Sequence, residues 1–217
     1  MKVVEWYRTA VRQQRSRRYM LIGLLIVAFV GVDVVVYRWY SNRYNARAQQ
    51  ELAHCMEIVE RALKEKQPAL LEQARLETGV GYERYSRSSL APYFLALDAD
   101  LALAQGDRTK ACALMERAVG ALSDDAAMYG FYAVKKALMK IDSADQKTRE
   151  AGMQELQTLA HDPRNQQREM AAYYLGLIAF DGGDRRGAEE VWKEFSGPVA
   201  RNSVWARLAQ SKLSYSE

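Results

Sequence analysis

The residue types that most often do chemistry are scarce in this chain and are not grouped. The histidines and cysteines number two each, namely His54, His161, Cys55 and Cys112. They form no cluster with carboxylates at the spacing of a metal site. The glycines at 79–81 and 182–183 are too few for a phosphate-binding loop, and no Lys-Ser/Thr pair follows them. We therefore expect no enzyme activity, no cofactor and no bound metal, and a function that depends on a surface.

The two cysteines leave two interpretations open. An oxidising compartment would allow Cys55 and Cys112 to pair. Two cysteines are too few for a disulfide framework, so two buried thiols are the favoured interpretation.

Composition predicts an all-α fold. The chain has four prolines, and Ala, Leu, Glu, Gln, Arg and Lys dominate it after Val36. The net charge of +4 comes from the first 18 residues, which carry six basic residues and one acidic residue. The remainder is close to neutral, which argues against nucleic acid as a partner.

An apolar run from Tyr19 to Tyr37, YMLIGLLIVAFVGVDVVVY, divides the chain. About 20 apolar residues are enough for a helix to cross a bilayer. The sequence predicts a basic cytoplasmic arm over 1–18, an uncleaved transmembrane signal anchor over 19–40 and a helical domain over 41–217. The excess of arginines before the run predicts that the N-terminus is cytoplasmic and that the C-terminal domain lies on the other side of the membrane.

Two alternatives to the anchor fit the sequence less well. A cleaved signal peptide would need a small-x-small site close to the run, and VYRWYSNRY offers none. A buried core helix would need a second apolar run as its partner. Asp33 lies near the outer end of the run, where a carboxylate that reaches the interface is favoured over a polar contact with a membrane partner.

The absence of glycine and proline between Asp33 and Gln67 predicts that the anchor helix continues into the domain. A second helix is expected from Ala69 to Thr78, ending at Gly79. A terminal capping helix is expected over 203–214, with inward side chains at Val204, Trp205, Leu208 and Leu213.

A repeat of helix pairs is visible from Leu90 onward. In two segments a small residue, Ala99 or Gly176, stands 12 positions before an alanine, Ala111 or Ala188. A Gly-Asp turn lies between them in both. We expect each turn to end one helix and cap the next, while the small residues allow close packing. A weaker middle copy is expected to use Gly130, Ala133 and Ala151 after a longer turn.

These positions resemble the tetratricopeptide repeat, whose helix pairs stack into a solenoid. The resemblance is good from Leu175 to Phe195 and from Ala99 to Ala118. It implies that the first helix of each pair lines a groove that binds an extended peptide or a partner helix. The expected groove residues are Tyr93, Asp100, Phe131, Lys135, Met170, Tyr173, Tyr174 and Phe180.

An N-terminal anchor followed by a short repeat domain is similar to the ancillary Sec-translocon subunit family. That resemblance implies a single-pass protein of the bacterial inner membrane whose C-terminal domain is periplasmic. It also implies a non-enzymatic, membrane-anchored interaction scaffold that acts with the translocon and with periplasmic chaperones. The alternative is a structural subunit of a larger envelope assembly, built by stacking of repeats. A third hypothesis is an accessory to a lipid- or peptidoglycan-associated enzyme, which would require a pocket.

Overall fold

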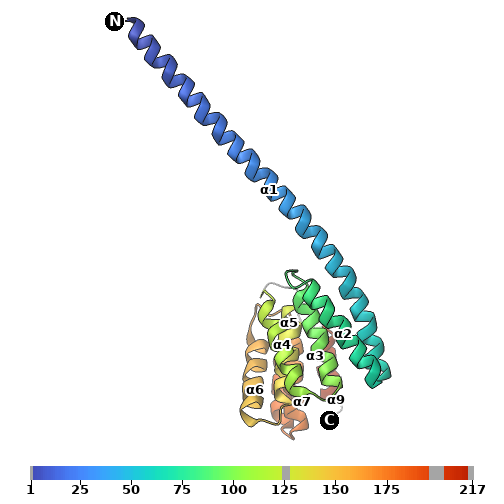
Figure 1. The fold of residues 1–217 in the computed structure, drawn as a ribbon. Coiled ribbons are helices and arrows are strands. Elements are labelled where there is room, and N and C mark those ends of the chain that lie inside the picture. The colour runs from blue at the N-terminus through green and yellow to red at the C-terminus, as the bar shows by residue number, and fades with distance from the viewer. Residues whose placement is uncertain (1, 124–127, 196–202, 215–217) are drawn as a thin grey trace. The chain divides into compact units, whose positions relative to one another are not determined.

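The structure is a computed structural model that describes the backbone of residues 2–123, 128–195 and 203–214. Within these ranges, side chains are described from Phe29 to Lys212. Every regular element in the described ranges is a helix, which confirms the predicted all-α class (Figure 1). The helices are α1 Lys2–Glu65, α2 Pro68–Arg84, α3 Ala91–Ala104, α4 Arg108–Ala121, α5 Tyr129–Ile141, α6 Gln146–His161, α7 Arg168–Asp181, α8 Arg185–Glu194 and α9 Val204–Ser214.

The chain divides into two compact units, Met1–Arg47 and Ala48–Glu217. Helix α1 belongs to both, so the predicted continuation of the first helix into the domain is confirmed. Helix α1 ends just before Lys66. The φ of Lys66 is 53°, in the left-handed region, where the helical hydrogen-bond pattern cannot continue. Proline at the first position of α2 then starts the next helix.

No helix in the described part of the chain is both long enough and apolar enough to cross a membrane. This finding contradicts the predicted transmembrane anchor over 19–40, and with it the predicted inner-membrane localisation and orientation. From Phe29 the described apolar run reaches only Tyr37 before Arg38, and Asp33 interrupts it, whereas a span needs about 20 residues. The side chains of the predicted arm, 1–18, and of residues 19–28 lie outside the described residues.

The second unit is built from helices that pack in chain order. Helices α3 and α4, α5 and α6, and α7 and α8 form pairs, and α2 with α3, α4 with α5 and α6 with α7 join them. The turns predicted inside the first and last of these pairs are confirmed. Gly106 and Gly183 have φ values of 84° and 88°, which side chains disfavour. Asp107 and Asp184 then cap α4 and α8, accepting hydrogen bonds from the Lys110 and Gly187 amides.

The small residues of these two pairs are buried where the helices meet. Ala99 and Ala111 are fully buried in one core cluster with Met115. In the last pair Gly176 faces Trp192, an indole that is 1% exposed. A Cβ at Gly176 would lie 2.5 Å from Trp192 Cε2, so only glycine fits this contact without a shift.

The middle pair packs through other residues than the sequence suggests. The close approach lies between Ala137 of α5 and Gly152 of α6, where a Cβ at Gly152 would stand 2.8 Å from the Ala137 carbonyl oxygen. Gly130 instead faces the loop before α7, since its Cβ would lie 3.2 Å from Gln167 Cγ. The turn here has no Gly-Asp pair, and Asp145 caps α6 through the Thr148 amide.

Two further helices differ from expectation. Helix α2 does not end at Gly79 but continues to Arg84, and Gly81 lets the Phe94 ring approach, because a Cβ there would be 2.5 Å from Phe94 Cε1. In α9 the buried residues are Ala206 and Ala209. Trp205 packs inward as predicted, whereas Val204 and Leu208 are 56% and 39% exposed. Leu213 lies outside the residues whose side chains are described.

Candidate functional site

The first helices of the pairs carry a series of half-buried aromatic side chains, which continues on α9. We call this set the aromatic row; its members are Tyr93 on α3, Phe131 and Tyr132 on α5, Tyr173 and Tyr174 on α7, and Trp205 on α9. Helix α7 contacts both α5 and α9, so the row passes between neighbouring helices.

One end of the aromatic row joins α3 to α5. The Tyr132 ring lies edge-on to Tyr93, with centroids 5.8 Å apart, and edge-on to Phe131 at 5.3 Å. Edge-to-face pairs at this separation contribute about 0.5–1.5 kcal/mol beyond the buried area. The three rings therefore hold one another in fixed positions across the boundary between two helix pairs.

An ion pair lies beside these rings. Lys135 Nζ is 2.6 Å from the Asp100 carboxylate, and the two side chains are 28% and 22% exposed. The same ammonium lies 6.0 Å from the centroid of Phe131, within the range of a cation–π contact. The pair neutralises the charge within the row, so the surface offered to a ligand is aromatic with tyrosine hydroxyls.

Tyr132 is the most perturbed titratable group of the row. Burial, together with the charge of Asp100 and the neighbouring Tyr93, raises the pKa of Tyr132 to about 12. Its phenol therefore remains a neutral hydrogen-bonding group throughout the physiological pH range.

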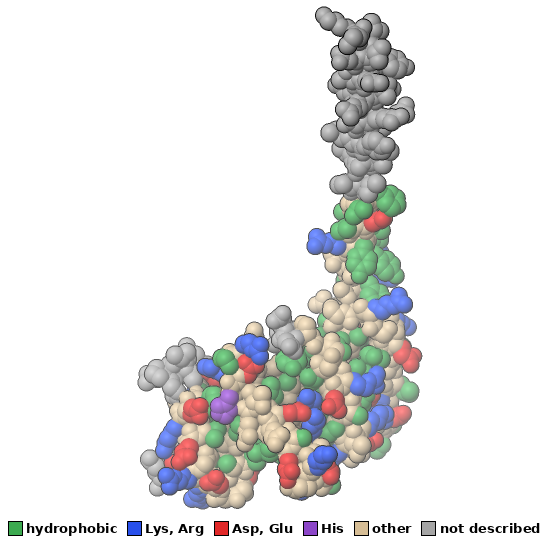
Figure 2. All heavy atoms as spheres, turned by 90° about the vertical axis from the view of Figure 1, so that its left-hand side faces the viewer, with side chains coloured by type: hydrophobic (Ala, Val, Ile, Leu, Met, Phe, Trp, Pro, Cys, Tyr) green, Lys and Arg blue, Asp and Glu red, His purple; other side chains and the backbone are tan. Residues whose placement is uncertain are grey.

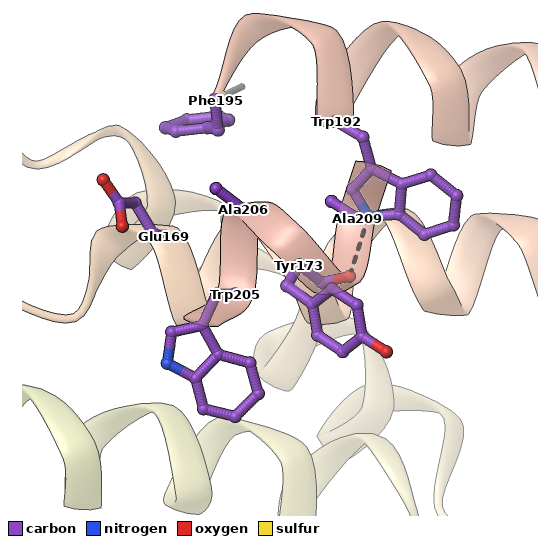
Figure 3. Close-up of a pocket in the computed structure, with 7 residues that line it drawn as sticks. All are labelled: Glu169, Tyr173, Trp192, Phe195, Trp205, Ala206 and Ala209. Atoms are coloured by element: carbon purple, nitrogen blue, oxygen red, sulfur yellow. Dashed lines mark hydrogen bonds between the residues drawn. The ribbon is translucent and has the colours of Figure 1, made fainter. Parts of the chain in front are cut away.

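The other end of the aromatic row is anchored on α8 and α9 (Figure 3). The Trp205 ring is 5.6 Å from both Tyr173 and Tyr174, and these two tyrosines are 5.4 Å apart. Beneath them the Trp192 indole donates a 3.1 Å hydrogen bond to the Tyr173 carbonyl. The space enclosed here is only about 10 Å³, room for about one water molecule, so this end is packed and offers a surface rather than a pocket.

Six of the eight predicted groove residues belong to the aromatic row or its ion pair. Met170 does not, because it is 5% exposed and forms part of the core between α5, α6 and α7. Phe180 lies at the end of α7, 6.0 Å from Trp192 and beneath the Arg185 guanidinium. Both positions fall on a first helix, but helical spacing alone does not say which side of the helix is covered.

Two members of the row were not predicted. Tyr132 follows Phe131 directly, so only the packing of α5 on α3 reveals that adjacent residues both reach the surface. Trp205 belongs to the terminal helix, which was expected only to cap the core. The sequence signal for Trp205 is an aromatic residue at the start of the last helix. In the structure α9 contacts α7, as the first helix of a further pair would.

The histidines and cysteines have no shared site. Within the described ranges no three His, Cys, Asp or Glu side chains are placed to hold a metal ion. His161 is exposed, bonds through Nδ1 to the Gln157 carbonyl oxygen and packs on Phe195. Cys55 is buried and Cys112 half-buried, both as free thiols. Burial, with Glu51 and Glu77 nearby, raises the pKa of Cys55 to about 11, so its thiol is unreactive at neutral pH.

Asp33, which was singled out within the predicted anchor, is exposed on the first unit. Its neighbours Val32 and Val34 are 60% and 50% exposed as well. The described part of the chain gives Asp33 no ion-pair partner.

Comparison of the chain with protein-family models, with curated proteins and with solved structures finds no match in any of the three.

Proposed function

We propose that this chain is a non-enzymatic protein-interaction scaffold, and that its aromatic row binds an amphipathic helix of a partner protein. The observation that carries the proposal is the row itself. Each of four helices, α3, α5, α7 and α9, contributes at least one half-buried aromatic side chain to it. Tyrosine and tryptophan are the side chains most enriched where proteins bind one another, because they give a large contact area at low entropic cost.

The geometry of the row favours a helix over an extended strand. Packed helices lie about 8–10 Å apart, so successive aromatic groups repeat at about that distance. Two turns of an α-helix advance about 10.8 Å, which places every seventh side chain of a crossing helix over the next aromatic group. Side chains on one face of a β-strand repeat at about 6.6 Å. An extended peptide that contacts one aromatic group would therefore not place a side chain over the aromatic group of the next helix.

The electrostatics of the row support an apolar rather than a charged ligand. Lys135 and Asp100 neutralise each other at 2.6 Å. A charged ligand would compete with this pair, whereas an apolar side chain can lie on the rings and leave the pair intact.

Site-specific photocrosslinking tests this proposal. A benzoylphenylalanine at Tyr174 should crosslink a partner, and the crosslinked peptide should carry apolar residues with a period of seven. The same group at Gln157, an exposed residue on the second helix α6, is the matched control and should give no such adduct. Translocon subunits or secretory chaperones among the adducts would identify the partners that the family resemblance implies. Equal adducts at both positions, or a crosslinked proline-rich segment without that period, would sink the proposal.

A second candidate function, a subunit of an assembly built by stacking of repeats, is favoured by α9. This helix packs on α7 and α8, while Val204 and Leu208, one turn apart, are left largely exposed. A further helix stacked there would bury both. Sedimentation velocity of the chain and of the double variant Val204→Glu/Leu208→Glu separates the two candidates, because only stacking predicts an oligomer that the variant abolishes.

A further inference from the structure

A concave site lies between α5 and α6, and no residue of the aromatic row lines it. Its cavity measures about 420 Å³, within the usual range for ligand sites. The α5 residues that line it are Tyr129, Ala133 and Lys136. At about 100° per residue, these positions lie roughly 100–160° around the helix from Phe131 and Lys135, whereas Tyr132 lies only about 40–60° from Tyr129 and Lys136. Helix α6, at the left of Figure 1, lies on the side of the domain that Figure 2 turns to the viewer.

Two ammonium groups share one carboxylate at the wall of this cavity. Glu155 Oε2 is 3.1 Å from Lys136 Nζ, and Oε1 is 2.6 Å from Lys140 Nζ. The two lysine side chains are only 19% and 15% exposed. Glu116 Oε1 lies 3.4 Å from Lys140 Nζ, but the Glu116 side chain is 64% exposed, so water screens this second ion pair.

Glu155 and Lys140 hold each other in their charged forms. Burial works against ionisation of Glu155, but the hydrogen bond from Lys140 and the positive charges of Lys136 and Lys140 outweigh it and hold the pKa of Glu155 below its ordinary value. Burial also works against the charge of Lys140, yet its bonds to Glu155 raise the pKa of Lys140. Lys136 lines the cavity, whereas Lys140 is held away from it by Glu155 and Glu116.

The cavity also has hydrogen-bonding capacity left over. An ammonium has three N–H donors. Lys136 lies 3.1 Å from Glu155 Oε2 as an ion pair, but that oxygen accepts no hydrogen bond, so the Lys136 N–H groups remain available. The Gln154 side-chain amide lines the same cavity. Thr158 donates its hydroxyl to the Gln154 carbonyl, which leaves its oxygen free to accept. Ala133, Ala151 and Leu159 supply an apolar part of the wall.

We propose that this cavity binds a carboxylate whose oxygens take hydrogen bonds from Lys136 Nζ and the Gln154 amide and whose short apolar portion lies on Ala133, Ala151 and Leu159. The ligand binds Lys136 without displacing Glu155 from Lys140. The carboxylate belongs either to a small organic acid or to the C-terminus of a polypeptide, which share this chemistry.

NMR titration of the full ¹⁵N-labelled chain tests the site, with sodium glutarate as the first probe at constant ionic strength. Saturable shifts are expected at the amides of residues 133, 151 and 158. Lys136→Gln should weaken binding at least about tenfold, since a charge-assisted hydrogen bond is lost. Lys193→Gln, which changes an exposed lysine on α8, is the matched control and should leave the affinity unchanged.

Two more arms complete the test. Glu155→Gln frees both lysines and should tighten glutarate binding several-fold, whereas Gln154→Ala, an exposed position that tolerates truncation, should weaken it. A short peptide with a free C-terminus is compared with its amidated form, and stronger binding of the free acid assigns the site to polypeptide ends. Absence of saturable shifts with either probe overturns the proposal. So does unchanged affinity in both Lys136→Gln and Gln154→Ala.

Discussion

The contact between Gly176 and Trp192 allows a quantitative prediction about how the last helix pair is held together. In the variant Gly176→Ala the new Cβ would lie 2.5–2.6 Å from two carbon atoms of the Trp192 ring. The indole is 1% exposed and cannot move outward without losing its 3.1 Å hydrogen bond to the Tyr173 carbonyl. The ring must therefore shift within a filled core.

The terms of this change can be estimated separately. Overpacking of a core costs about 1–3 kcal/mol, and loss of the indole hydrogen bond costs about 1 kcal/mol. Replacement of glycine by alanine inside a helix returns about 1 kcal/mol. The free energy of unfolding should accordingly fall by about 1–3 kcal/mol.

Urea denaturation followed by circular dichroism measures this loss, and near-UV circular dichroism reports the displacement of the Trp192 ring. The control is Gly79→Ala in α2, where a Cβ would meet nothing within 4 Å. That variant should be more stable by up to about 1 kcal/mol, from helix propensity alone. A Gly176→Ala protein as stable as Gly79→Ala, with an unchanged near-UV spectrum, would refute the close-packing argument.

Three further predictions concern other parts of the domain. Lys135→Ala should lower the free energy of unfolding by about 1 kcal/mol, because it leaves a half-buried carboxylate unpaired; Lys193→Ala, in an exposed pair, should cost less than about 0.5 kcal/mol in the same urea titration. Absorbance at 295 nm should show Tyr132 ionising near pH 12. Since its folded pKa lies above the unfolded value of about 10, its contribution to stability is complete below pH 10 and disappears as the pH rises towards 12; a Tyr132→Phe variant should lack this step. With a thiol reagent at neutral pH, Cys112 should react while Cys55 reacts only when the domain unfolds, and equal rates would contradict the burial of Cys55.

The sequence predicted those parts of the fold that local chemistry decides. Gly106 and Gly183 occupy left-handed backbone conformations, and the aspartates that follow them cap the next helices. Each such turn is specified by two adjacent residues, so it can be recognised without knowledge of the partner helix.

The middle pair could not be aligned in the same way, because no Gly-Asp turn marks its register. Gly130 and Ala151 looked like the small packing residues, but Ala137 and Gly152 perform that role. The extension of α2 through Gly81 depends on the Phe94 ring, which approaches from another helix. Such contacts between helices leave no pattern within one helix.

The candidate site was predicted in part for a related reason. Placement on a first helix was enough to identify Tyr93, Phe131 and Tyr174. The rotation of each helix against its neighbours then decides which aromatic is covered, and it buries Met170 while leaving Tyr132 half-exposed. That rotation is a property of the assembled helical domain.

The aromatic row as a partner-binding surface is tested most directly by comparing two phenylalanines in similar surroundings. Phe131 lies in the row beneath the Lys135 ammonium, and Phe180 lies outside it beneath the Arg185 guanidinium. The affinity for the partner peptide crosslinked at Tyr174 is measured for Phe131→Ala and Phe180→Ala by calorimetry, with the fold of each variant checked by circular dichroism. Phe131→Ala should weaken binding at least about tenfold, the loss typical of an interface residue that matters, while Phe180→Ala should bind as the original chain does. Equal affinities for the two variants would contradict the assignment of the row as the binding surface.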